Sequence, residues 1–112
     1  MSTPQNPDVG DLQITPSDDD SSLLTVTGEV DAHTCGRLKA ALDDLLGSAG
    51  DAPDLVVDMT GVTFLDSSGL RVLIGAYKEA EDRGGRLRLR SPSDGVVRLL
   101  EITGLADRFI AE

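Results

Sequence analysis

Two adjacent serines between an aspartate and a glycine are the residues of this chain best placed to do chemistry. Asp66, Ser67, Ser68 and Gly69 follow an apolar run at residues 55–57 and precede apolar side chains at helical spacing, namely Leu70, Leu73, Ile74 and Tyr77. This pattern predicts a buried strand, a polar loop and an amphipathic helix. Serine and aspartate suit a helix start, because their oxygens accept hydrogen bonds from unpaired N–H groups of the first turn.

Phosphorylation is the reaction that best fits an exposed serine at a helix start. A phosphate adds about 1.5 to 2 negative charges and three acceptor oxygens. The helix dipole and the first-turn N–H groups favour that charge, so the fold itself should tolerate the modification. A partner docked beside Asp66, and beside Asp31 in an earlier turn, would be repelled by it. The sequence therefore predicts a charge switch that controls association.

Catalysis by the chain itself finds little support. A serine hydrolase would need Gly-x-Ser-x-Gly, but Leu65 stands where the first glycine around Ser67 belongs, and His33 is the sole possible base. The glycine-rich motifs that cradle nucleotide phosphates are absent, and no cluster of cysteine and histidine suggests a metal site. The acidic turn at residues 17–22 lacks the ligand alternation of a calcium loop. We therefore expect that the chain has no catalytic residue, cofactor or metal, and that it is not an enzyme.

The charge and composition restrict the partners. The 112 residues carry a net charge of −10, and residues 1–66 hold 13 acidic and 2 basic side chains. Such a balance argues against nucleic acid, which needs a positive surface. The acidic half either steers a basic partner or only confers solubility. The sequence has no apolar run of the roughly 20 residues that span a membrane and no secretory signal. With the single Cys35, this predicts a cytoplasmic protein that does not bind membranes.

Strand and helix patterns alternate along the chain. Residues 1–10 are expected to form a flexible tail, and residues 11–112 one domain. Strands are predicted at residues 12–14, 23–27, 55–57 and 86–90, and helices after Asp31, after Ser67 and at residues 96–103. Residues 108–110 form a last strand or a docking segment. We expect an α/β fold with three to four helices and a mixed sheet of four to five strands: an antiparallel opening hairpin, then parallel β-α-β units.

Four motifs in register resemble the STAS-domain anti-sigma-factor antagonists of bacteria. The central one is Phe64-Leu65-Asp66-Ser67-Ser68-Gly69-Leu70. The turn at residues 28–31, Gly-Glu-Val-Asp, the double glycine at residues 84–85 and the closing segment at residues 97–105 are similar to the family in the same order. The resemblance covers residues 10–112.

The resemblance implies a function. Unphosphorylated antagonists of this family bind an anti-sigma factor that is also a serine kinase with a histidine-kinase-like ATPase fold, and so release a sigma factor. The kinase phosphorylates the first serine of the motif, here Ser67, and a serine phosphatase reverses this. Carried over to this chain, the partner-binding residues are Asp31, Asp66, Ser68, Gly69 and Leu70, with Ser68 as the expected helix cap. Asp31 either contacts the partner or only shapes its loop.

Two points remain open at this level. Arg71 stands where many relatives carry glycine, which either alters the choice of partner or is a neutral surface change. The alternative function is a STAS module that is not phosphorylated and serves as a scaffold in a larger stress-signalling assembly.

Overall fold

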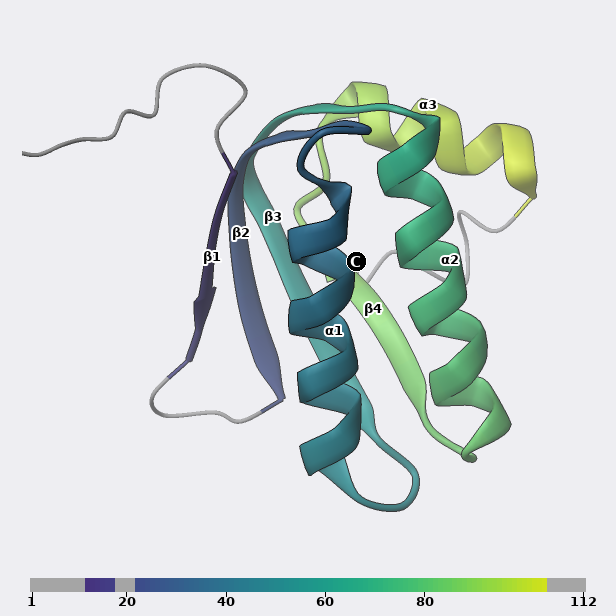
Figure 1. The fold of residues 1–112 in the computed structure, drawn as a ribbon. Helices are drawn as coiled ribbons and strands as arrows, with labels where there is room; N and C mark the ends of the chain where they lie inside the picture. The colour runs from purple at the N-terminus through teal and green to yellow at the C-terminus, as the bar shows by residue number, and fades with distance from the viewer. Residues whose placement is uncertain (1–11, 18–21, 105–112) are drawn as a thin grey trace, which may run out of the picture.

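The computed structural model describes residues 12–17 and 22–104, which form four strands and three helices. Figure 1 shows them in chain order. The elements are β1 (Leu12–Pro16), β2 (Leu23–Val30), α1 (Cys35–Ala49), β3 (Asp54–Leu65), α2 (Ser67–Asp82), β4 (Arg86–Arg90) and α3 (Asp94–Thr103). The predicted order of elements is confirmed. The expected tail at residues 1–10, the carboxylates at residues 18–20 and the possible strand at residues 108–110 lie outside the described residues.

The sheet is mixed, as expected, with the strand order β1-β2-β3-β4. β1 pairs antiparallel with β2, whereas β2 with β3 and β3 with β4 are parallel. Each parallel pair is joined by a helical crossover, which leaves the carboxyl ends of β2 and β3 at the same edge of the sheet. The segments that follow these two strands therefore meet.

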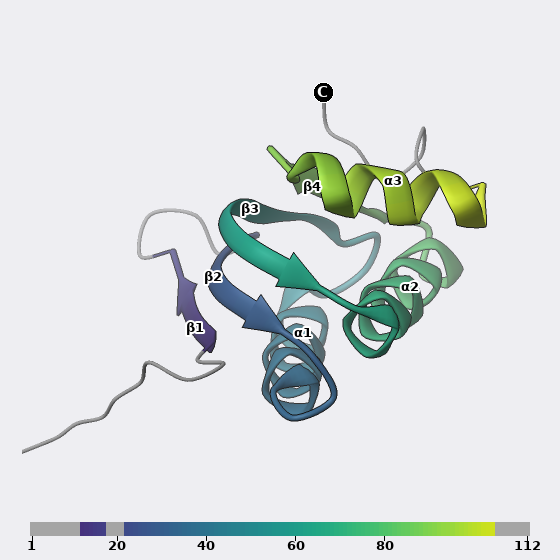
Figure 2. The same ribbon diagram turned by 90° about the horizontal axis from the view of Figure 1, so that it is seen from above.

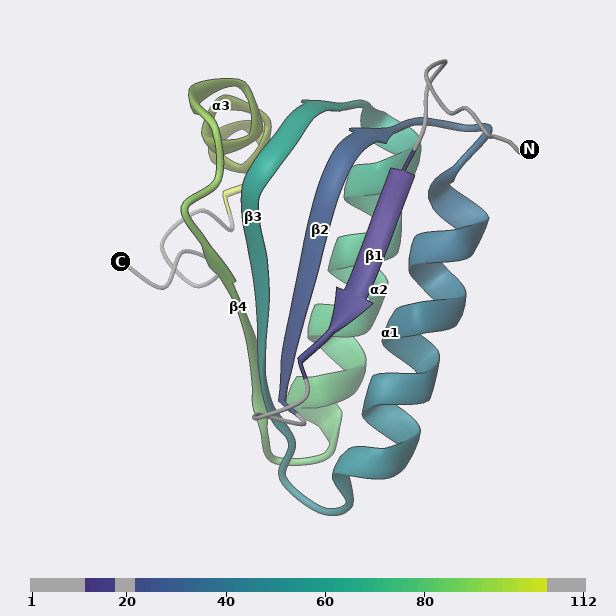
Figure 3. The ribbon, with the colours of Figure 1, turned by 90° about the vertical axis from the view of Figure 1, so that its left-hand side faces the viewer.

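The helices cover the two faces of the sheet unequally. α1 and α2 lie side by side on one face, and α3 crosses the other (Figures 2 and 3). Alternate residues of the strands point into the layer beneath α1 and α2, since successive strand side chains face opposite ways. Aliphatic side chains dominate the core, which includes Leu24, Val26, Leu42, Leu55, Val57, Leu73, Leu87 and Leu89.

The third strand is longer than its apolar run, and here the predicted loop is wrong. β3 continues through the polar residues that follow Val57 and ends at Leu65. Thr27 pairs with Gly61 and Gly28 with Val62, and a register shift lies on either side of these two pairs. An added Cβ at Gly61 would lie 2.6 Å from Thr27 Cγ2, so glycine permits the close approach of the strands. The site at the end of β3 is thus carried by a long strand and not by a loop.

The helix ends follow the glycine signals in the sequence. α1 ends before Gly50 and α3 before Gly104, both at positive φ, and Gly84 at φ +83° follows the end of α2. Ser93 caps α3, since its side chain accepts a hydrogen bond from the N–H of Val96. These stops fix the lengths of the crossovers that bring the carboxyl ends of β2 and β3 together.

β4 alternates between arginine and leucine, and its leucine face is buried. Leu87 and Leu89 are fully buried, while Arg86 and Arg88 both reach the Asp54 carboxylate, at 3.4 and 3.1 Å. Arginine side chains therefore serve an ion-pair cluster between β3 and β4, and two of the three are not free to bind an external anion.

Candidate functional site

Ser67 is the first residue of α2 and its side chain is exposed. Leu65 ends β3 with its side chain buried, so the chain turns outward over the next two residues. Within the described part of the chain, no hydrogen bond or ion pair engages the Ser67 hydroxyl. Ser68 is half-buried. Of the two adjacent hydroxyls, that of Ser67 is the more accessible to a partner or an enzyme.

Asp66, and not Ser68, caps the helix. The Oδ1 atom of Asp66 accepts hydrogen bonds from the N–H groups of Ser68 at 2.9 Å and Gly69 at 3.2 Å. Its backbone is extended, as an N-cap residue requires. The expected cap role of Ser68 is therefore wrong, because the residue before the serine pair already satisfies these donors. Asp66 remains half-buried, with its charge at the start of α2.

Gly69 and Leu70 pack inward. An added Cβ on Gly69 would lie 2.5 Å from Val30 Cγ1 and 3.1 Å from Leu65 Cδ1, so only glycine fits here without movement. The side chain of Leu70 belongs to the core and is 9% exposed. Both residues hold the first turn of α2 against β2 and β3. Their predicted contact with a partner stays a prediction.

Asp31 shapes its own turn. Its carboxylate accepts hydrogen bonds from the N–H groups of His33 at 2.9 Å and Thr34 at 3.0 Å. The Thr34 hydroxyl lies 3.2 Å from the same oxygen, 2.9 Å from the Glu29 carbonyl, and accepts from the N–H of Asp31. The N–H of Thr34 is the main cause that lowers the pKa of Asp31 below its usual value. The sequence left open whether Asp31 contacts the partner or only shapes its loop, and this network supports the second role.

The turns after β2 and β3 are joined through Val30. The N–H of Asp66 donates to the carbonyl oxygen of Val30 at 3.1 Å, and Val30 pairs with Leu65 across the sheet. Figure 1 shows the two turns together at the upper end of the sheet. Asp31, Asp66 and Ser67 are therefore brought to one edge, as the family resemblance implied, while Gly69 and Leu70 lie beneath that edge.

Two residues here have a place in the site that the sequence did not predict. Thr34 is the sole polar or charged residue in the buried class within the described ranges, at 3% exposure. Phe64, the second-last residue of β3, is 49% exposed and lies just before the site. Val62 and Leu65 are buried while Thr63 and Phe64 are both exposed, so strict alternation does not hold at the end of β3 and could not have identified Phe64.

Other chemistry remains unsupported. His33 is exposed in the turn that Asp31 organises, and Cys35 is half-buried at the start of α1. Across residues 12–17 and 22–104, no three side chains of the metal-ligating types come together. In the same ranges, none of the helices has the length and apolar character needed to cross a bilayer.

The sequence of this chain matches a family model and a group of named relatives. The family model described as "Mlab, STAS domain" matches residues 15–111. An anti-sigma-B factor antagonist of Listeria monocytogenes is 40% identical over 96 residues, which cover 86% of this chain and 82% of the relative.

Two solved structures extend the likeness to the fold. An anti-sigma factor antagonist from Mycobacterium paratuberculosis aligns with a TM-score of 0.74 at 28% identity, over 88% of this chain and 82% of the other. The Bacillus protein SpoIIAA in its phosphorylated form aligns with a TM-score of 0.64 at 20% identity, over 88% of each chain. At that lower identity the likeness concerns the fold.

Proposed function

The chain belongs to the STAS-domain family of anti-sigma-factor antagonists, and from this premise we propose that it is a phosphorylation-controlled antagonist. In its unphosphorylated form it binds an anti-sigma factor that is also a serine kinase, and a sigma factor is released. Phosphorylation of Ser67 ends that binding. A serine phosphatase that acts on the phosphorylated form restores it. The chain supplies the acceptor hydroxyl and the docking surface, whereas ATP and catalysis belong to its partners, in the cytoplasm.

The observation that carries the proposal is the state of the Ser67 hydroxyl. It is exposed, has no hydrogen-bond partner in the described residues, and is not needed to cap α2, because Asp66 does so. An acceptor must be reachable by a kinase active site and free to lose its proton. Ser68, the neighbouring hydroxyl, is half-buried and meets this requirement less well.

The switching effect follows from charge. Asp66 and Asp31 already make this edge of the sheet acidic, and a phosphate adds about two further charges. Like charges placed together at an interface cost several kcal/mol. Phosphorylation therefore weakens a partner that holds a carboxylate near this edge, without requiring the fold to change.

The test is a binding and labelling experiment with candidate kinases. Native mass spectrometry records the complex with and without ATP, and peptide mapping locates the phosphate. We expect a complex without ATP, its loss after phosphorylation, and the label on Ser67. The Ser67→Ala chain should stay bound in the presence of ATP. A label on Ser68 would contradict the assignment of the acceptor.

Gel filtration and labelling of the same samples distinguish the antagonist function from the scaffold function. A chain that forms a large homo-assembly on gel filtration and takes no label from any candidate kinase would be a scaffold module. A small species that binds a kinase and is labelled supports the antagonist.

A further inference from the structure

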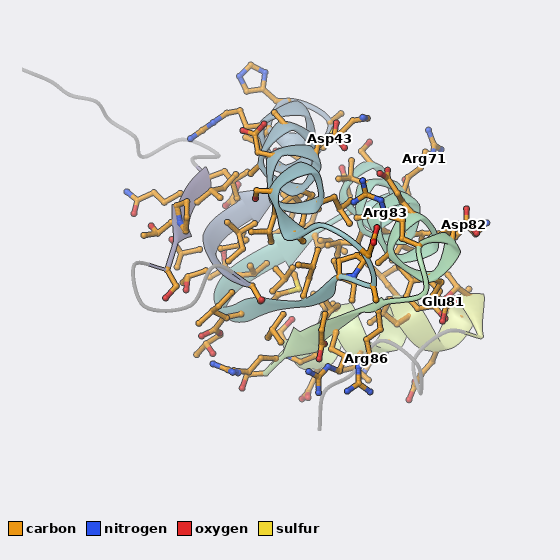
Figure 4. All side chains as sticks on the ribbon, turned by 90° about the horizontal axis from the view of Figure 1, so that it is seen from below. Asp43, Arg71, Glu81, Asp82, Arg83 and Arg86 are labelled. Carbon is orange, nitrogen blue, oxygen red and sulfur yellow. The ribbon has the colours of Figure 1, made fainter. Side chains whose placement is uncertain are left out.

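Arg71 lies one helical turn after Ser67 on the same helix, and its side chain is exposed. Residues four apart on a helix share a face, and their side chains tilt toward the helix N-terminus. The guanidinium of Arg71 can therefore extend back over the turn that carries Ser67. Figure 4 shows Arg71 projecting away from the ribbon on the side of the molecule that carries α1 and α2.

Arg71 is not engaged elsewhere in the described ranges. The ion pairs found there are Lys39 with Asp43 at 2.9 Å and the two arginines of β4 with Asp54. Lys39, the lysine of the adjoining helix α1, is thus already held by a carboxylate. Arg71 has no such partner in the described ranges, and on α2 it is the cation that lies one helical turn from Ser67.

The sequence predicted that the first-turn N–H groups would favour a phosphate on Ser67, but three of these donors are already used in the structure. The N–H groups of Ser68 and Gly69 already donate to the Asp66 carboxylate, and that of Leu70 donates to the Asp66 carbonyl at 2.9 Å. A phosphate on Ser67 would also lie next to the Asp66 charge. The helix start therefore offers few free donors, and the phosphate needs a counter-charge from a side chain.

We propose that Arg71 binds the phosphate of phosphorylated Ser67 and neutralises part of its charge within the chain. The inference rests on the proposed function, because it assumes that Ser67 is the acceptor. A guanidinium presents two N–H donors in a fork that matches two phosphate oxygens, which a lysine ammonium does not.

The pairing also changes the surface of α2. Arg71 lines a groove of about 360 Å³ between α1 and α2, over apolar side chains that include Leu42, Val72 and Ala76. In the unphosphorylated chain this cation faces the groove and solvent. Once it pairs with the phosphate it is withdrawn, so phosphorylation both adds negative charge and removes a free positive charge from this helix.

The test uses a chain with phosphoserine placed at position 67 by genetic encoding or ligation, so that no kinase is needed. A ³¹P NMR titration gives the second pKa of the phosphate. In Arg71→Ala we expect this pKa to rise by about 0.3 unit, the size of an exposed ion pair one helical turn apart. Arg71→Lys should restore part of the difference. The other titratable groups are the same in every variant, namely Asp31, His33 and Asp66 around the site and Lys39, Asp43 and Glu79 in the groove that Arg71 lines.

The matched control is Arg98→Ala, which removes an exposed arginine from α3 on the opposite face of the sheet. It should leave the phosphate pKa unchanged. Equal pKa values in the parent and Arg71→Ala, or an equal rise in Arg98→Ala, would overturn the proposal. A failure of every kinase to label Ser67 would refute the proposed function but leave this titration unaffected, so the two failures are distinguishable.

Discussion

The N–H of Asp66 donates to the carbonyl oxygen of Val30 at 3.1 Å, which ties the start of α2 to the end of β2. The side chain of Val30 is fully buried and lies where a Cβ on Gly69 would be. Hydrogen bonding and packing therefore act at the same junction. The position of Ser67 depends on this junction, so substitutions there should change both the free energy of unfolding and the affinity for a partner.

Substitution of Gly69 by alanine should destabilise the chain. The added Cβ would lie 2.5 Å from Val30 Cγ1, so the helix start must shift, at a cost of about 1 to 3 kcal/mol in the free energy of unfolding. Gly75→Ala, in the middle of the same helix with nothing within 4 Å, is the control and should stabilise by up to about 1 kcal/mol. Urea denaturation measures both, and a neutral Gly69→Ala would disprove the tight junction.

Substitution of Asp66 by alanine should remove the cap of α2 and cost about 1 kcal/mol. Asp66→Asn should recover most of this loss, since an amide oxygen can still accept from Ser68 and Gly69. Ser67→Ala is the matched control and should change the free energy of unfolding by less than about 0.5 kcal/mol. Thermal and urea denaturation give the ranking. A larger loss for Ser67→Ala than for Asp66→Ala would mean that the serine caps.

Acid should weaken the turn after β2. The pKa of Asp31 is lowered in the folded chain, chiefly by the Thr34 N–H, so its stabilising effect is complete above the ordinary value of 3.8 and is lost as the pH falls through the lowered pKa. Asp58, whose pKa is lowered mainly by the Thr60 hydroxyl, should behave alike. Urea midpoints of the parent and Asp31→Asn should therefore converge below pH 3.8.

The control for that titration is Asp44→Asn, which removes one negative charge from the exposed face of α1. The pH-dependent difference in urea midpoint between the parent and Asp31→Asn should exceed the difference between the parent and Asp44→Asn, which reports the change in net charge alone. If that difference instead grew as the pH fell, the carboxylate of Asp31 would not be the stabilising form.

Phe64 should contribute more to binding than to stability. Its ring is about half exposed beside the site, so Phe64→Ala should cost less than about 1 kcal/mol of stability. Large apolar side chains at the centre of an interface commonly dominate affinity, and we expect at least a tenfold weaker complex with a cognate kinase. Ile102→Ala, an exposed apolar residue on α3, should leave this affinity unchanged. Calorimetry compares the two variants.

Much of this architecture could be read from local sequence signals. Apolar residues at two- and four-residue spacing mark the strands and helices. Glycines mark the ends of α1, α2 and α3, and all of these signals are local. The length of β3 was not accessible in this way. Thr60, Gly61 and Thr63 look like a loop, yet they belong to the strand because β2 pairs beside them, a contact between distant segments.

The site was predicted in its position but not in its internal roles. Adjacent Asp and Ser residues all favour a helix start, so propensity could not decide between Asp66 and Ser68 as the cap. The decision comes from where β3 ends, since Leu65 is buried and Asp66 follows it in an extended conformation. The inward packing of Gly69 likewise depends on Val30, which lies 39 positions earlier in the chain.

Asp66 as the cap has a further consequence for evolution and regulation. The side chain that holds the helix together is not the side chain that would be modified, so structural support and signalling reside in different residues. Under the proposed function, gain or loss of a phosphate on Ser67 therefore leaves the cap of α2 in place. A substitution of Ser67 would remove the proposed phosphorylation site while the domain stayed folded.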